Sequence, residues 1–194
     1  MLTYDDAHAL LHRYGGDSPW IRHCMAVSRV AARVGALMMP KYGLDVDYLT
    51  VGALLHDIGR YKTHDPIMHG VEGYRLLTSL GHHREAFICA SHILCGMSRA
   101  EASRFGLPDQ DFLPLDMEQR LVPMLDSLVE FDKPTTLEQR VLSINRRYHD
   151  KAWFLVRMQQ AAATARGLLE ELDLELGISL EQVAAEALSS EGAS

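Results

Sequence analysis

The sequence has no apolar run close to the roughly 20 residues that a helix needs to cross a bilayer. Its first residues, MLTYDDAHALLHRYGG, lack the basic region and apolar core of a secretion signal. Cysteine is scarce, and Cys24, Cys89 and Cys95 form no CxxC pair and lie in apolar helical patterns. These absences predict a cytoplasmic protein without membrane contact, whose cysteines are reduced thiols of the core.

Basic residues are in the minority. The chain has 19 lysines and arginines against 26 aspartates and glutamates, which gives a formal net charge of −7. Proteins that coat nucleic acid by counterion release carry the opposite sign, so we expect no nucleic-acid partner. Arginines placed close together could still bind a small anion.

The sequence also lacks the alternation of apolar and polar residues that marks half-buried strands. Apolar residues instead recur at helical spacing between capping residues and glycines, which predicts an all-α fold. The expected helices cover about residues 3–14, 18–40, 47–58, 65–80, 83–94, 98–106, 116–131, 137–148, 150–176 and 179 onward.

The length of 194 residues favours one domain of about 150 residues with room for an extension. A weak linker, Asp132-Lys133-Pro134-Thr135-Thr136, divides the helical pattern. We therefore expect a core over residues 1–132 and a C-terminal helical extension over residues 133–194 that packs on the core. Apolar surface over residues 151–176 suits either this packing or dimerisation, so a homodimer stays open.

Ten histidines stand out in a chain of this size, and some of them face inward. His23 shares a helical face with valines four, seven and eleven residues further on. His56 lies on an apolar face, and Asp57 projects about 100° further around the same helix, so a metal ion between them can reach both. Asp126 occupies an apolar stripe of a third helix, where an uncompensated carboxylate is costly.

Each of these side chains also has a purely structural explanation. A single inward histidine is more often a hydrogen-bonded core residue than a ligand, and a buried acid beside it is often an ion pair. Three apolar helices that each bury an imidazole or a carboxylate need a common partner, however, and a divalent cation satisfies them together. His69 and His92 follow the same logic and could hold a second metal, while His64 stays undecided. The histidines expected at the surface or at helix ends are His8, His12, His82, His83 and His149.

The run LLHDIG over residues 54–59 comes after His23 and before Asp126, which gives the order H…HD…D. This pattern resembles the HD-domain metal-dependent phosphohydrolase superfamily over about residues 18–132, and the HDIG form of the doublet is comparatively specific. The resemblance implies a helical bundle around a metal site, here with additional C-terminal helices.

Several further segments narrow the resemblance within the superfamily. HDIGRYKTH, HGVEG, ASHILCG and MLDSLVEF look most like small stand-alone HDIG proteins of archaea and bacteria, whose substrates are largely undefined. The chain is more distantly similar to bacterial symmetrical diadenosine tetraphosphate hydrolases. It departs from the HD-GYP branch because no His-His-Glu or GYP segment follows the second histidine, so cyclic-di-GMP hydrolysis is disfavoured.

The resemblance also implies two divalent metals that are bridged by Asp57. It further implies that Asp57 and Arg60 are the catalytic residues. The residues implied for the first metal are His23, His56, Asp57 and Asp126, and those that add the second are His69 and His92. Iron and manganese are the foremost candidates, and nickel, cobalt or magnesium also suit such ligands. The implied reaction is hydrolysis of a phosphoester or phosphoanhydride in a small, nucleotide-like phosphorylated substrate by a metal-activated water.

Cationic side chains near the motif are candidates for substrate contacts. Arg60 and Lys62 follow the doublet, where enzymes of the superfamily that this chain resembles have a basic residue. Both also suit a helix C-terminus, where positive charge is favoured without any function. Arg99 is a third candidate, whereas Arg146 and Arg147 fit a solvated face.

Two other functions stay open. Some HD-domain proteins resemble this chain in ligand set but house a mixed-valence di-iron centre that activates oxygen, and dependence on oxygen and iron would indicate that class. A non-catalytic module that binds a nucleotide is the other alternative, which a ligand-induced rise in melting temperature without product would indicate. The full ligand set argues against the module, because degenerate HD modules tend to lose ligands.

Overall fold

The computed structural model describes residues 2–189, and the regular secondary structure of this part of the chain is almost entirely helical, as the sequence predicts. The elements in chain order are α1 (Tyr4–Gly15), α2 (Trp20–Tyr42), α3 (Val46–Leu55), η1 (Ile58–Tyr61), α4 (Met68–Ser79), α5 (His83–Ser91), η2 (Ile93–Cys95), α6 (Arg99–Arg104), α7 (Met117–Asp126), β1 (Val129–Glu130), β2 (Lys133–Pro134), α8 (Leu137–Arg147), α9 (Ala152–Leu176) and α10 (Leu180–Ser189). The all-α prediction is confirmed.

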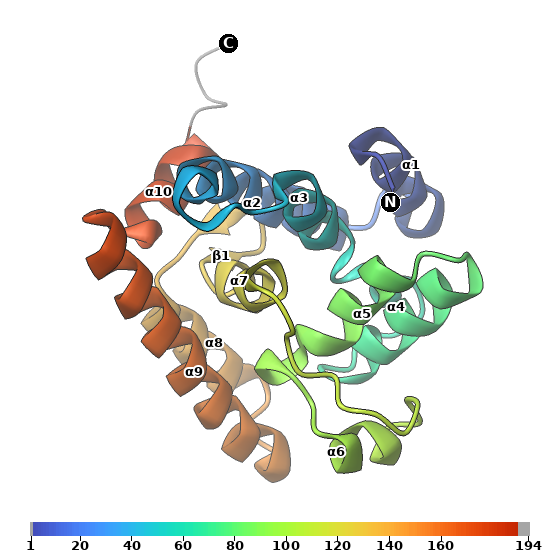
Figure 1. Ribbon diagram of the computed structural model, residues 1–194. Helices are drawn as coiled ribbons and strands as arrows, with labels where there is room; N and C mark the ends of the chain where they lie inside the picture. The colour runs from blue at the N-terminus through green and yellow to red at the C-terminus, as the bar shows by residue number, and fades with distance from the viewer. Residues whose placement is uncertain (1, 190–194) are drawn as a thin grey trace.

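Helix α7 lies at the centre of the molecule (Figure 1). Three helix pairs surround it: α2 with α3, α4 with α5, and α8 with α9. The helix contacts α2, α3, α5, α9 and η2, which come from both halves of the chain. Any side chain at the C-terminal end of α7 therefore meets residues from distant parts of the sequence.

Capping residues set the start of several helices. Thr3 accepts a hydrogen bond from the backbone N–H of Asp6 at the start of α1, and Ser98 forms a capping box with Glu101 at the start of α6. Asp116 accepts from the N–H of Gln119 at the start of α7. These short-range signals were readable in the sequence, and the predicted starts are confirmed.

Three helices end earlier than the periodicity predicts. The third helix ends at Leu55 rather than near residue 58, because the chain turns at His56 and Asp57 before the 3₁₀ helix η1. The fifth ends at Ser91 rather than near residue 94, because Leu94 and Cys95 adopt positive φ angles of 54° and 57°. Such left-handed residues cannot continue a right-handed helix.

The third early end lies in α7, which stops at Asp126 rather than near residue 131. The following residues form a small antiparallel hairpin in which Val129 pairs with Pro134. Phe131, in the turn of this hairpin, has a positive φ of 57°. All three early ends coincide with a residue that the sequence marks as a site candidate: Asp57, His92 and Asp126.

The C-terminal helices share the main hydrophobic cluster with the rest of the chain. Val141 of α8, Phe154 of α9 and Leu180 of α10 belong to the same buried cluster as Val30 of α2 and Leu121 of α7. The described part of the expected extension is therefore packed against the expected core. A domain boundary at residue 132 stays a prediction.

The three cysteines are free thiols, and Cys24 and Cys89 are buried as expected, while Cys95 is partly buried. Burial raises the pKa of the Cys95 thiol to about 12. Within residues 2–189 the structure has no helix that is both long and apolar enough to span a membrane.

Gly59 packs directly on the backbone of α4. A Cβ atom added at residue 59 would lie 1.9 Å from the carbonyl oxygen of His69 and 2.4 Å from the backbone nitrogen of Gly73. Because these neighbours are backbone atoms, η1 and α4 would have to separate.

We expect Gly59→Ala to lower the free energy of unfolding by about 2 kcal/mol or more, as overpacking does in a close-packed interior. Gly167→Ala is the matched control, because residue 167 is an exposed position of α9 and an added Cβ meets no described atom within 4 Å. The control should gain about 0.5 to 1 kcal/mol from helix propensity. Urea unfolding measures both values, and equal stability of the two variants would contradict the expectation.

Candidate metal centre

Six side chains that the sequence marks as metal ligands meet at the middle of the bundle. They are His23 of α2, His56 and Asp57 of the turn after α3, His69 of α4, His92 after α5, and Asp126 at the end of α7. The histidines and Asp57 are each less than a tenth exposed, whereas the Asp126 side chain is 23% exposed. The helical periodicity correctly assigns an inward face to the four histidines.

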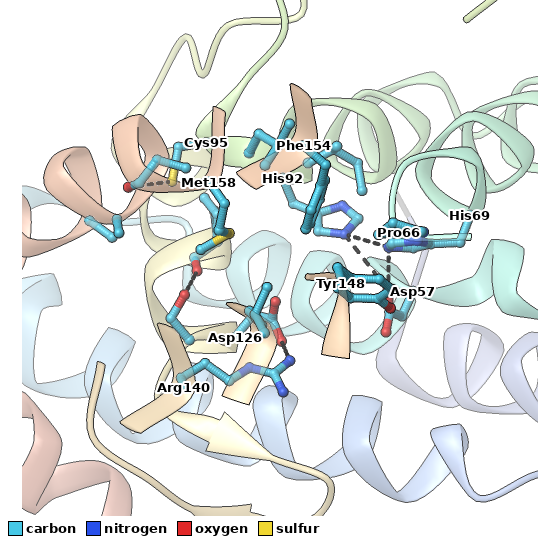
Figure 2. Close-up of a pocket in the computed structure, with 18 of the residues that line it drawn as sticks. Asp57, Pro66, His69, His92, Cys95, Asp126, Arg140, Tyr148, Phe154 and Met158 are labelled. Carbon is cyan, nitrogen blue, oxygen red and sulfur yellow. Dashed lines mark hydrogen bonds and ion pairs between the residues drawn. The ribbon is translucent and has the colours of Figure 1, made fainter. Parts of the chain in front are cut away.

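Asp57 lies between two pairs of histidines, His23 with His56 and His69 with His92. Figure 2 shows Asp57 beside the second pair. Its Oδ2 lies 4.0 Å from Nε2 of His23 and 3.8 Å from Nε2 of His56. Its Oδ1 lies 2.8 Å from Nε2 of His69 and 3.7 Å from Nε2 of His92. One carboxylate therefore serves two separate three-residue groups, each compact enough to hold a metal ion.

Asp126 joins the first of these groups. Its Oδ1 lies 2.8 Å from Nε2 of His23 and 3.8 Å from Nε2 of His56. Ligand atoms about 2 Å from a common ion are about 3 to 4 Å apart, depending on the coordination geometry. The donor atoms around both oxygens of Asp57 have spacings of this size.

The four imidazoles are held in one orientation by the backbone. The Nδ1 atom of each ring contacts a carbonyl oxygen: His23 that of Phe131 at 2.7 Å, His56 that of Ala53 at 2.7 Å, His69 that of Asp65 at 2.7 Å, and His92 that of Ile88 at 3.2 Å. Because a carbonyl oxygen only accepts, Nδ1 must carry the hydrogen and donate it. In the neutral ring Nε2 then presents its lone pair to the cluster, as metal-binding histidines do.

His56 supplies the sharpest test of whether a cation fits. Its Nε2 is buried and has no hydrogen-bond partner among the residues that the structure describes. The nearest charged atoms are carboxylate oxygens of Asp57 and Asp126, each 3.8 Å away. A lone pair that faces only oxygen acceptors in a buried site is unfavourable, and a cation between them removes the conflict. The residues present thus fit a divalent metal.

Burial and charge set the protonation states that such binding needs. Burial lowers the pKa of His56 to about 4 against the opposing effect of the nearby carboxylates, and burial also lowers the pKa of His69. Burial alone would raise the pKa of Asp57, but the guanidinium of Arg60 holds it well below its usual range. The pKa of Asp126 is likewise lowered, because its contacts with His23 and Arg140 outweigh burial. Near pH 7, His56 and His69 are therefore neutral and can offer a lone pair to a metal ion, and the two carboxylates are charged.

The helix ends add to the negative potential. Helices α3, α5 and α7 each end within one residue of the cluster, at Leu55, Ser91 and Asp126. The C-terminal end of a helix carries a partial negative charge from its free carbonyl groups. Three such ends around one buried cluster favour a cation there.

Arg60 and Arg140 are the cationic side chains closest to the carboxylates. Arg60 donates from Nε to Oδ2 of Asp57, as its place after the doublet suggests. Arg140 of α8 is 9% exposed, and its Nη2 lies 3.7 Å from Oδ1 of Asp126. No sequence motif marks Arg140, although it lies three residues after Leu137 on the apolar stripe of α8. The rule that singled out the inward histidines would have found it.

Lys62 and Arg99 lie elsewhere. Lys62 is 57% exposed and forms an ion pair with Glu72 at 2.6 Å. Arg99 begins α6, where its backbone N–H donates to Asp111. Neither residue lines the two cavities described next, so their predicted contacts with substrate have no support in the geometry.

Two cavities meet at the cluster. Asp57, Arg60, Arg140 and Arg147 line both of them. The first cavity extends between η2, α8 and α9, and Figure 2 shows Tyr148, Phe154 and Met158 on its wall together with His69 and His92. The second opens beside His23 and His64, and its other walls include Pro19, Trp20 and Phe131. Each cavity thus has a charged end at the cluster and an aromatic wall.

We expect manganese(II) to raise the free energy of unfolding of metal-stripped protein, by about 2.7 kcal/mol at a hundredfold excess over its Kd, since the ion binds only the folded cluster. His56→Gln should lose most of this gain, because it removes the Nε2 lone pair that has no hydrogen-bond partner and would bind the ion. His83→Gln, an exposed position at the start of α5, should keep it. Urea unfolding with and without a chelator measures the difference, and an equal gain in both variants would rule out the cluster as the site.

Comparison with known proteins places the chain in a family. The HD domain family matches residues 20–145. An uncharacterized protein of Methanocaldococcus jannaschii is 36% identical over 129 residues, which covers 66% of this chain and 76% of that protein. No solved structure matches the chain at a significant level.

Two longer proteins are also similar. The tRNA (cytidine(56)-2'-O)-methyltransferase of Thermoplasma volcanium is 31% identical over 160 residues, and the protein of the same name from Picrophilus torridus is 32% identical over 165 residues. The matches cover 81% and 84% of this chain but only 46% and 47% of those proteins. The chain thus spans about half the length of these two relatives.

The family match includes all six residues of the cluster and also Arg140. It agrees with the helical fold and with the histidine and aspartate groups that could hold a metal. The chain belongs to the HD domain family, within the superfamily of metal-dependent phosphohydrolases.

Proposed function

We propose that the protein is a metal-dependent phosphohydrolase that cleaves a phosphoester or phosphoanhydride of a small, nucleotide-like substrate. The observation that carries this proposal is the shared carboxylate of Asp57, with one pair of histidine Nε2 atoms at each of its two oxygens. The family to which the chain belongs supports the same reaction class.

Two sets of ligands follow from this geometry. His23, His56 and Asp126 would hold one divalent ion with Oδ2 of Asp57, and His69 and His92 would hold the other with Oδ1. When bound, such ions make hydroxide available near neutral pH and neutralise charge on phosphoryl oxygens. Iron and manganese suit this mixture of imidazole and carboxylate donors best, and nickel, cobalt and magnesium are alternatives.

The protein's own side chains have separate tasks in this proposal. Arg60 donates to Oδ2 of Asp57 and so keeps this carboxylate in one orientation. The same guanidinium lines both cavities, where it can contact a phosphoryl oxygen of the substrate. The backbone carbonyls at Nδ1 keep the histidine rings from rotating, so the donor atoms are in place before substrate arrives.

The cavity walls support a small organic phosphate. Tyr148 and Phe154 line one cavity, and Trp20 and Phe131 line the other, so a planar base has aromatic surface on either side of the cluster. The net charge of −7 favours a small molecule over nucleic acid as the substrate. The methyltransferase name of two relatives belongs to proteins of about twice this length, and we do not extend methyl transfer to this chain.

The test is phosphate release by manganese-loaded or iron-loaded protein, with a coupled phosphatase to reveal nucleotide products. Substrates are nucleoside monophosphates, cyclic nucleotides, dinucleoside polyphosphates and a short RNA with a terminal phosphate. We expect release from one of the nucleotide classes and a loss of at least about a hundredfold in Asp57→Asn, because an amide replaces the carboxylate that would hold both ions. Asp132→Asn, which changes a surface carboxylate paired with Arg22, should keep full activity.

The outcomes separate the alternatives. Release that persists without oxygen supports hydrolysis, whereas turnover that requires both iron and oxygen identifies an oxygenase. Binding of a nucleotide with no product under any metal identifies a non-catalytic module. Full activity of Asp57→Asn would contradict the proposed centre.

A further inference from the structure

Arg140 is a buried cation without a close hydrogen-bond partner. The residue is 9% exposed, and its Nε is buried with no acceptor in hydrogen-bonding range among the described residues. Its Nη1 lies 3.6 Å from Glu130 and its Nη2 lies 3.7 Å from Asp126, both longer than a direct hydrogen bond. A guanidinium has five N–H donors, and buried donors are satisfied in nearly all proteins.

The two carboxylates near Arg140 already have nearer partners. Oδ1 of Asp126 lies 2.8 Å from Nε2 of His23. Oε1 of Glu130 accepts from the hydroxyl of Ser143 and from Nη2 of Arg147 at 3.0 Å. Arg140 therefore contributes charge to these acids but donates no direct hydrogen bond to either of them.

The free donors lie where a ligand can reach them. Arg140 lines both cavities that meet at the cluster, and Figure 2 shows its guanidinium beside Asp126 on the wall of the first. Arg147, two turns further along the same face of α8, also lines both. The missing acceptor is thus best supplied by an anion in the cavity.

The charge balance around the cluster favours the same conclusion. Three acids at or beside the centre, Asp57, Asp126 and Glu130, are paired with three arginines, Arg60, Arg140 and Arg147. These charges cancel one another. Any divalent ion held by the histidines and aspartates would leave the site positive, and a multiply charged anion would neutralise it.

We propose that Arg140, with Arg147 beside it, forms an anion subsite on α8 that binds the terminal phosphate of a phosphate monoester. This inference rests on the proposed function and narrows its substrate class. Arg60 flanks the centre at Asp57, and Arg140 flanks it at Asp126, so a phosphoryl group there would meet guanidinium donors from two sides and, on a third, the ions that the histidines and aspartates would hold. A monoester has three non-bridging oxygens for these three contacts, whereas a diester has only two.

The experiment measures binding by calorimetry on manganese-loaded protein, with inorganic phosphate as the monoester-like probe and dimethyl phosphate as the diester probe. We expect Arg140→Gln to weaken phosphate binding about 10-fold to 100-fold, the loss typical of hydrogen bonds to a charged group. Arg140→Lys should give a smaller loss, because it keeps the charge but not the planar fork. Dimethyl phosphate should bind more weakly than phosphate to the unmodified protein.

Arg146→Gln is the matched control. Residue 146 has the same charge and lies on the same helix, but it is exposed and lines a different hollow with Gln139 and Leu142. This variant should bind phosphate as the unmodified protein does. Manganese content and far-ultraviolet circular dichroism, measured on every variant, show that metal and fold are retained.

An unchanged phosphate affinity in folded, metal-loaded Arg140→Gln would overturn the inference. If that variant does not fold, the same result in Arg140→Lys overturns it. Dimethyl phosphate binding as tight as phosphate would overturn the monoester assignment. Two outcomes separate the subsite from the proposed function. If the protein hydrolyses substrate but its phosphate affinity does not depend on Arg140, only the subsite is wrong. If phosphate binding depends on Arg140 but no hydrolysis is detected, only the proposed reaction is wrong.

Discussion

The buried charge of Asp57 is the constraint on which the rest of this structure depends. A carboxylate that is 2% exposed must be compensated, and here Arg60 and four histidines surround it. The histidines cannot all compensate it as protonated partners, because burial lowers the pKa of His56 to about 4. Neutral rings that point lone pairs at a carboxylate favour a positive charge between them, which is the chemical reason why metal ions would bind there.

The helices around this charge are arranged by where they end. Asp57 and His92 lie in the residues just after α3 and α5, and Asp126 is the last residue of α7, so the carbonyl ends of three helices face one cluster. Gly59 lets η1 lie against the backbone of α4, which brings His69 to within 2.8 Å of Asp57. Phe131, in a left-handed conformation, supplies the carbonyl that orients His23. The backbone conformation at Gly59 and Phe131 therefore helps to position the histidines of the cluster.

The C-terminal helices do more than cover the core. Helix α8 brings Arg140 and Arg147 to the same cavities as Arg60, and α9 contributes Phe154 and Met158 to the wall. The candidate metal ligands and the candidate anion subsite therefore come from the two sides of the expected linker at residues 132–136. A substrate that contacts the cluster and the subsite together would lie against residues from helices as far apart in the sequence as α2 and α9.

The sequence by itself determined the all-α fold, most helix starts and the inward faces of His23, His56, His69 and His92, because capping and helical periodicity are local properties. The HD motif also singled out Asp57 and Asp126. Only the tertiary structure decided where α3, α5 and α7 end. After α5, for example, the left-handed Leu94 and Cys95 carry no sequence signal like that of glycine. It also decided that Arg140 lies at the centre while Lys62 and Arg99 do not. Helical periodicity predicts that a face is buried, but which residues that face packs against depends on contacts between distant segments of the chain.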